Sequence, residues 1–281
     1  MKRLLNIELQ KLWKNRASKI LILTYFILLS FIALLASVNF NIIGIDFRLA
    51  DQGIFNFPYI WHFNTYVADA LKFFLAIVIV SMMANEYTYG TLKQNLIDGL
   101  SKEEFIKSKF YTVLLFAIAS TVFVFIMSLI LGYSFSSYTE ASIVFSDLQY
   151  IGAYFVKLLA FFSLCLFAGV FIKRSAFALG FIFVWYIAEG IMYAILKFQV
   201  FKGTDWADKI MGFFPMESMA NLLKEPFTRF QAYKALENLN NQGKVVSPKF
   251  YGIHWYEIII ALAWTAIFMY LSYRILKKRD L

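Results

Sequence analysis

Residues 110–132 read FYTVLLFAIASTVFVFIMSLILG, a run without one charged side chain. A helix rises 1.5 Å per residue, so about twenty residues cross about 30 Å of hydrocarbon, and this run is long enough to span a membrane. Similar apolar runs occur at 20–38, 66–84, 151–171, 177–197 and 255–273. The sequence therefore predicts an all-α integral membrane protein with six spans.

The composition supports this fold class. The 281 residues are 60% hydrophobic and 16% charged, whereas soluble domains are about 45–50% apolar and about 25% charged. Cys165 is the one cysteine and lies in a predicted span, so we interpret it as a small packing residue. The first apolar run follows basic residues, as in a signal peptide, but no small-x-small cleavage site follows it, and we expect an uncleaved span.

Basic residues predict the orientation. Segments 1–19, 85–109, 172–176 and 274–281 carry six, four, two and four Lys and Arg, whereas 39–65 carries one and 133–150 none. Segment 198–254 carries seven but has 57 residues, close to the length at which charge no longer governs translocation. We expect both termini in the cytoplasm and the protein in the cell membrane. Anionic lipid explains the net charge of +9 without a nucleic acid.

The segment before the first span has an amphipathic pattern. Leu5, Leu9, Leu12 and Trp13 recur at helical spacing, which predicts an interfacial helix within residues 1–19 whose apolar face meets the membrane. The alternative is a polar lead-in that only sets the topology.

Residues 84–109, ANEYTYGTLKQNLIDGLSKEEFIKSK, separate the second and third apolar runs. Apolar residues at helical spacing predict a short helix over 91–98, and Gly99 is suited to end it. Ser101 and Glu104 have the capping-box spacing, which predicts a second helix that continues into the third span. The apolar set consists of Leu92, Leu96, Ile97 and Leu100. We expect this set to offer a surface to a cytosolic partner; the alternative is a hairpin without a partner.

Segment 198–254 is a long outer loop with three of the four prolines. Its part 207–222 is apolar and interrupted by Gly and Pro, so it could fold back onto the membrane. Its part 228–244 is polar. No domain boundary and no internal repeat are evident.

Few charged residues fall within the predicted spans, and three of them lie at membrane depth. Lys72, Lys157 and Glu189 lie roughly 9–12 Å below the outer interface at 1.5 Å per residue. An unpaired charge at that depth is costly, so we predict that Glu189 pairs with Lys72 or Lys157. Asp69, one turn from Lys72, is a competing partner, and the alternative is that both lysines snorkel to the headgroups.

The sequence contains no catalytic pattern. It has no Gly-rich phosphate loop, no metalloprotease motif and no nucleophile elbow. Its two histidines have no nearby carboxylate or thiol pattern, so we expect no metal site. The chain is not expected to be an enzyme, and energy for any active transport has to come from a partner or from an ion.

The layout resembles the permease subunit of an ABC-2 type exporter. The resemblance rests on six spans and on the E-x-x-x-G-T-L motif formed by Glu86, Gly90, Thr91 and Leu92, followed by Leu96 and the run 101–109. Lys102 stands where family members often have Arg, which is a mild departure. The resemblance covers the whole chain in layout.

The resemblance implies that 85–109 is a coupling segment gripped by a separate cytosolic ABC ATPase, which binds ATP and Mg²⁺. It also implies a connecting helix at 2–16 and a second permease subunit, identical or related. No cofactor is expected on this chain, and no substrate follows from the family. Glu86 is expected to bond to the N-terminal helix or to Thr91, or else to be a solvated carboxylate.

Two other functions stay open. An ion-driven secondary carrier usually has repeats and spans broken by Gly or Pro, whereas the six predicted spans contain no proline and no detectable repeat. A non-transporting scaffold of a secretion or motility machine would not need Lys72, Lys157 and Glu189 at membrane depth.

Overall fold

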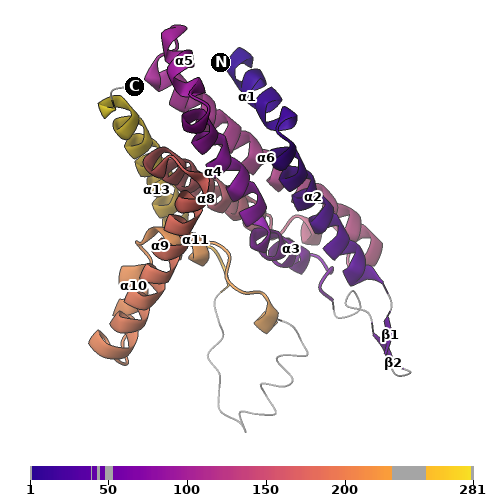
Figure 1. Ribbon diagram of the computed structural model, residues 1–281. Coiled ribbons are helices and arrows are strands. Elements are labelled where there is room, and N and C mark those ends of the chain that lie inside the picture. The colour runs from indigo at the N-terminus through magenta and orange to yellow at the C-terminus, as the bar shows by residue number, and fades with distance from the viewer. Residues whose placement is uncertain (1, 39, 43–44, 48–52, 230–250, 280–281) are drawn as a thin grey trace.

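The computed structural model describes residues 2–38, 40–42, 45–47, 53–229 and 251–279. Long helices form one bundle, and α1 (Lys2–Lys14), α5 (Thr91–Ile97) and both chain ends lie at the same end of it (Figure 1). We call this end the terminal end and the opposite end, where the hairpin and the long loop lie, the loop end. The two chain ends lie on the same side of the bundle, which is what an even number of spans would give.

Among the described residues, up to six segments are long and apolar enough to cross a membrane, which confirms the predicted all-α membrane fold class. Five are single helices, namely α2 (Arg16–Ser37), α6 (Lys102–Phe135), α8 (Gln149–Ile172), α9 (Ser175–Ile195) and α13 (Trp255–Lys278). The sixth combines α3 (Tyr59–Ala70) and α4 (Lys72–Thr88), which meet at 45°. The predicted second span, 66–84, begins within α3, passes the bend and ends within α4, and its bounds stay a prediction.

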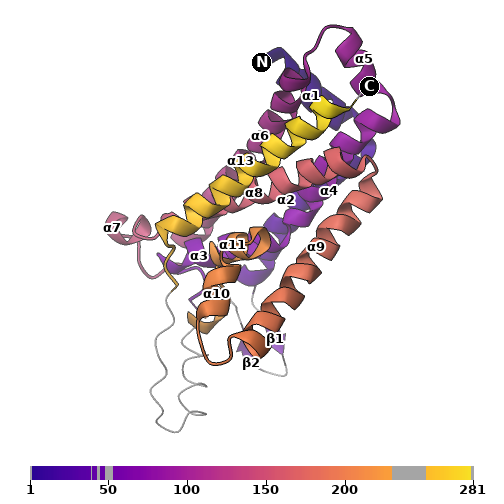
Figure 2. The ribbon, with the colours of Figure 1, turned by 90° about the vertical axis from the view of Figure 1, so that its left-hand side faces the viewer.

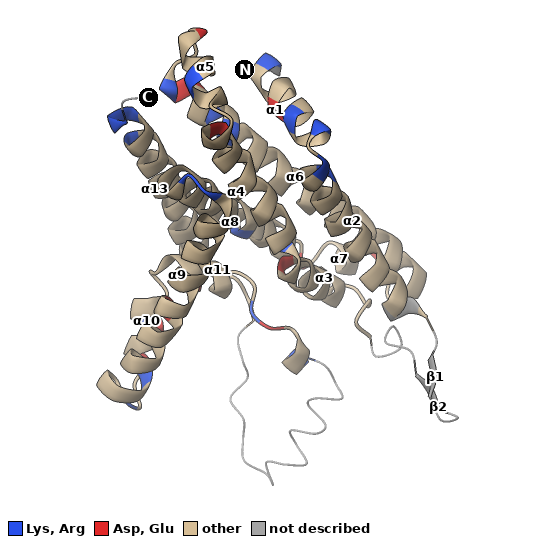
Figure 3. Cartoon of the chain, viewed as in Figure 1, with Lys and Arg blue, Asp and Glu red and all other residues tan. Residues whose placement is uncertain are grey.

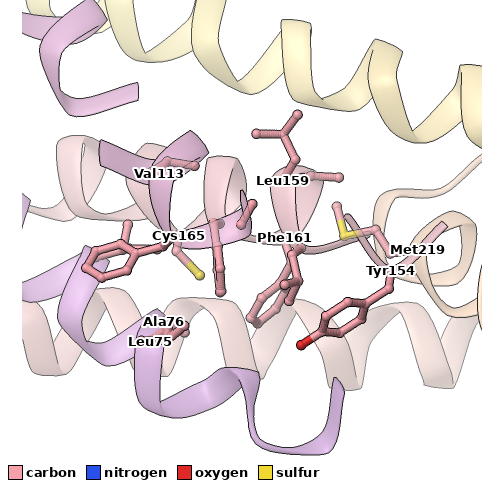
Figure 4. Close-up of a cluster of buried hydrophobic side chains, with 14 of the residues drawn as sticks. Leu75, Ala76, Val113, Tyr154, Leu159, Phe161, Cys165 and Met219 are labelled. Carbon is pink, nitrogen blue, oxygen red and sulfur yellow. The ribbon is translucent and has the colours of Figure 1, made fainter. Parts of the chain in front are cut away.

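Helix α8 lies at the centre of the bundle. It contacts α3, α4, α6, α9, α11 (Pro215–Asn221) and α13. Tyr154, Phe162, Leu164 and Cys165 on α8 are fully buried, and Figure 4 shows Tyr154 and Cys165 within the apolar cluster. A helix that is apolar on every side needs neighbours on every side, and α8 has them. Cys165 is a packing residue, as predicted.

Helix α9 has the opposite character. It leaves the bundle at an angle, with most of its surface exposed (Figures 1 and 2). Phe183, Val184 and Tyr186 are each more than 60% exposed. These side chains suit lipid or another apolar surface rather than water.

Short elements close the loop end. Strands β1 (Phe40–Ile42) and β2 (Ile45–Phe47) form an antiparallel hairpin, a small exception to the all-α prediction. The others are α7 (Ala141–Val144), a π-turn (Leu196–Val200), α10 (Trp206–Met211), α11 and a 3₁₀ turn (Phe227–Arg229).

Part of the predicted outer loop folds back onto the bundle. Helix α11 contacts α8, α9 and α13, and Met211, Met219 and Leu222 are buried. Part of the apolar segment 207–222 is thus shielded by protein, which suits its broken helical backbone, whereas Phe213 is 65% exposed. Most of the polar part predicted at 228–244 lies outside the described residues.

Candidate functional site

Helix α5 projects from the terminal end between α4 and α6 (Figure 2). Gly90 precedes it with φ 68° and Gly99 follows it with φ 95°, a left-handed backbone that glycine adopts without strain. Ser101 and Glu104 then form the predicted capping box at the start of α6. The expected sequence of short helix, turn and long helix is confirmed.

The four apolar residues predicted as one docking surface face different ways. Leu92 is 2% exposed, and Leu96 and Leu100 are partly buried against the core. Ile97, in contrast, is 76% exposed. The prediction of a single apolar anchor is wrong, because Leu92 and Leu96 lie on the face of α5 that packs back onto the protein, whereas Ile97 lies about 100° further round the helix. Leu100 lies beyond the end of α5 and also packs against the core.

The side of α5 that points away from the bundle has mixed chemistry. Tyr89 is 72% exposed. Lys93, Gln94 and Asp98 are exposed as well. We call this set the free face of α5; its members are Tyr89, Lys93, Gln94, Ile97 and Asp98.

Four charged side chains meet below α5, and we call them the terminal charge cluster: Glu8, Lys11, Glu86 and Lys109. The Lys109 ammonium is buried and lies 2.6 Å from Glu8 Oε2 and 2.6 Å from Glu86 Oε1. Lys11 Nζ donates to the same Glu86 oxygen at 2.9 Å. Charged residues of α1, α4 and α6 gather at this end (Figure 3). Two carboxylates and two ammonium groups balance, which a buried cluster requires.

Glu86 links the cluster to α5. Its second oxygen accepts a hydrogen bond from Thr91 Oγ1 at 2.5 Å, and Thr91 is the first residue of α5. Both expected partners of Glu86, the N-terminal helix and Thr91, are therefore present at once. Glu86 is 4% exposed, so the alternative of a solvated carboxylate is wrong.

Glu8 and Lys109 were missed by the sequence analysis. Glu8 lies between Leu5 and Leu12 on the face of α1 that packs against α6, and a carboxylate within such a stripe is a signal of a buried partner. Lys109 stands where a polar segment gives way to an apolar run, which looks like an ordinary membrane border. The pKa of the Lys11 ammonium is raised, because Glu8 and Glu86 together outweigh its partial burial, which lowers it.

Helix α1 packs on the protein with part of its predicted apolar face. Leu12 is buried, and Leu5 and Leu9 are partly buried. Trp13 is 55% exposed and lies under the Lys19 ammonium, 5.0 Å from the ring centroid. The prediction that these four residues form one interfacial face stays a prediction; Trp13 is the exposed member of the set. The helix ends at Lys14, and Asn15 caps α2 through a bond to the Ser18 amide.

The predicted ion pair of Glu189 is absent from the described residues. Lys72 and Lys157 both contact Asp69, at 2.8 Å and 3.1 Å, so the competing partner is the correct one. Glu189 instead accepts hydrogen bonds from Trp185 Nε1 and from the Met216 amide at 3.0 Å. The first amides of a helix have no partner within it, and Glu189 satisfies two of them at the start of α11, those of Met216 and Glu217.

No metal centre is evident in the part of the chain that the structure describes, because no three His, Cys, Asp or Glu side chains there could share an ion.

The comparison with known proteins decides the family. Residues 4–281 match the family described as ABC-2 family transporter protein. The chain belongs to this family. It is also similar to YhcI of Bacillus subtilis (strain 168), an uncharacterized protein, with 36% identity over 77 residues. That match covers a quarter of each chain. The resemblance found in the sequence is thus confirmed, and the protein is a multi-pass membrane protein of a transporter family.

Proposed function

We propose that this ABC-2 family protein is the membrane-spanning permease subunit of an ATP-driven exporter. In this proposal the terminal end faces the cytoplasm and the protein resides in the cell membrane, as the distribution of Lys and Arg indicates. ATP and Mg²⁺ bind to a separate cytosolic ABC ATPase, since this chain has no phosphate-binding loop.

The main support for the proposal is helix α5, which we assign as the docking element for the ATPase. Its inner face is fixed by the buried Leu92 and by the Thr91–Glu86 hydrogen bond. Its free face exposes Ile97 and Tyr89 among polar side chains. A short helix that is rigid on one side and exposed on the other suits insertion into a groove of a partner.

The terminal charge cluster provides the route by which docking acts on the spans. Glu86 lies at the end of α4, Lys109 near the start of α6 and Glu8 on α1. A force on α5 therefore reaches three helices through ion pairs shorter than 3 Å. An ATPase with different affinities for two arrangements of these helices drives the switch between them.

A second permease subunit completes the proposal. Two ATPase sites need two docking surfaces, and one chain offers one α5. The apolar side chains of α9, exposed in a single chain, are available to a second copy, a related chain or lipid.

One observation favours the ion-driven carrier as a second candidate. The second span is broken between α3 and α4, and Asp69, Lys72 and Lys157 meet beside the break. Broken spans with charges at membrane depth are common in carriers. Transport by a carrier would persist without ATP and without a cytosolic partner.

A pull-down from native membranes in mild detergent tests the proposal. We expect a P-loop ATPase to copurify with the wild type and to be lost from Ile97→Asp. Glu103→Ala is the matched control, because Glu103 is exposed at the same end but lies outside the free face. If no ATPase copurifies with the wild type, the exporter proposal fails. If Ile97→Asp retains the ATPase, docking occurs elsewhere.

A further inference from the structure

An arginine side chain at the loop end is enclosed by aromatic rings. Arg229 ends the 3₁₀ turn, and the rings come from α3, from the start of α8 and from the residues just before α13. We call these rings the aromatic cage; its members are Tyr59, His62, Tyr150 and Tyr251. None of them contributes to the terminal charge cluster.

The cage contacts the guanidinium by two kinds of interaction. Arg229 Cζ lies 5.0 Å from the Tyr59 ring centroid and 5.5 Å from that of Tyr251, within the range of cation–π attraction. Arg229 Nη1 donates to His62 Nδ1 at 3.1 Å and to the Tyr150 hydroxyl at 3.3 Å. Rings and lone pairs are thus directed at one cation.

An acid adds to the attraction. Asp147, just before α8, places a carboxylate oxygen 3.8 Å from Arg229 Nη2. A carboxylate beside aromatic faces raises the preference for a cation over a neutral group of the same shape.

Contacts that do not involve the guanidinium hold the cage together. The His62 ring stacks on Tyr150 with centroids 4.2 Å apart. The Tyr150 hydroxyl donates to the Tyr251 carbonyl at 3.0 Å, and the Tyr59 hydroxyl donates to the Pro226 carbonyl at 2.6 Å. A cage built in this way persists when the arginine side chain leaves.

The histidine is oriented to receive a cation. His62 Nε2 lies 2.9 Å from the Lys224 carbonyl oxygen, which can only accept, so Nε2 carries the proton. Nδ1 therefore presents a lone pair to Arg229. A neutral ligand without N–H donors would leave this lone pair unsatisfied.

We propose that the aromatic cage is a binding site for a guanidinium or alkylammonium group, and that Arg229 is its resident occupant in this state. A ligand or partner that presents such a group at the loop end replaces the Arg229 side chain, which swings out while the cage keeps its shape. The inference is independent of the proposed ATPase, since it concerns the opposite end of the bundle.

Chemical rescue tests the site on the purified full chain in detergent. Arg229→Ala empties the cage, and we expect its thermal unfolding midpoint to fall by about 3–6 °C. Methylguanidinium at millimolar concentration is then expected to restore at least about half of that loss, in proportion to cation–π and hydrogen-bond contacts regained. Urea is planar and keeps N–H donors but lacks the positive charge, so it is expected to restore less of it than methylguanidinium does.

Two controls separate binding from a general salt effect. Arg174→Ala removes an exposed arginine at the other end of the bundle, and methylguanidinium should not stabilise it. Arg229→Ala combined with Tyr251→Leu removes one ring, and the rescue should be lost. If Arg229→Ala does not fold, Arg229→Met keeps the aliphatic stem and takes its place. Equal effects of methylguanidinium and urea, or no rescue in either variant, overturn the proposal.

Discussion

The Lys109 ammonium lies 2.6 Å from the Glu8 carboxylate, which joins the first helix to the entry of α6 across 101 positions of sequence. Lys109 also contacts Glu86 at 2.6 Å, so one buried cation holds two carboxylates from different helices. Without it, the partly exposed Lys11 would be left as the cation between these two buried carboxylates. Lys109 is therefore the centre of the terminal charge cluster.

Lys109→Met is expected to destabilise the protein by about 3–5 kcal/mol, because it leaves two buried carboxylates with one partly exposed lysine between them. Chemical unfolding in detergent measures the loss. The matched control is Lys107→Met, two residues away, whose side chain is 55% exposed and pairs with the exposed Glu103. That change is expected to cost less than about 1 kcal/mol. Similar losses for both variants would contradict the central role of Lys109.

Thr91→Val is expected to weaken capture of the ATPase without unfolding the bundle. The change removes the hydrogen bond to Glu86, worth about 1.5–3 kcal/mol for a charged acceptor, and so releases the first turn of α5. Thr91→Ser keeps the hydroxyl and should bind as the wild type does. The ratio of ATPase to permease after copurification is the measurement. Equal ratios for Val and Ser would show that the bond does not position α5.

The spans could be predicted from the sequence because the requirement is simple. A hydrocarbon layer demands about twenty apolar residues per crossing, whatever the neighbouring helices do. The break between α3 and α4 could not be predicted in this way, because it depends on a contact between helices. Asp69 and Lys72 look like the polar border of a span, and only the approach of Lys157 from α8 makes them an interior group.

The candidate site shows the same limit. Gly99 after α5 and the capping box before α6 are local signals, and they were predicted correctly. The burial of Leu92 and the exposure of Ile97 depend on how α5 rests on the bundle, which helical spacing alone does not decide. The partners of Glu189 were out of reach for a related reason, because they are backbone amides of a distant short helix.

Glu189→Gln is expected to cost about 1–3 kcal/mol, because its amide oxygen can replace only one of the two accepting carboxylate oxygens, and either Trp185 Nε1 or the first amides of α11 then lose their acceptor. Glu189→Leu is expected to cost more, since Trp185 Nε1 and the α11 amides lose their acceptor together. Unfolding in detergent distinguishes the two. A Gln variant as stable as the wild type would contradict a role for both carboxylate oxygens.

Asp69→Asn is expected to be the most damaging single change within the spans. It leaves the ammonium groups of Lys72 and Lys157, which are 13% and 5% exposed, with no anion between them. Breaking a buried pair in this way costs about 3–5 kcal/mol, and repulsion between the two cations adds to it. Lys157→Met alone leaves the Asp69–Lys72 pair intact, so it should be milder. Asp69→Asn combined with Lys157→Met removes one charge of each sign and should recover part of the stability lost in Asp69→Asn. A double variant no more stable than Asp69→Asn would mean that an anion other than Asp69 balances the two lysines.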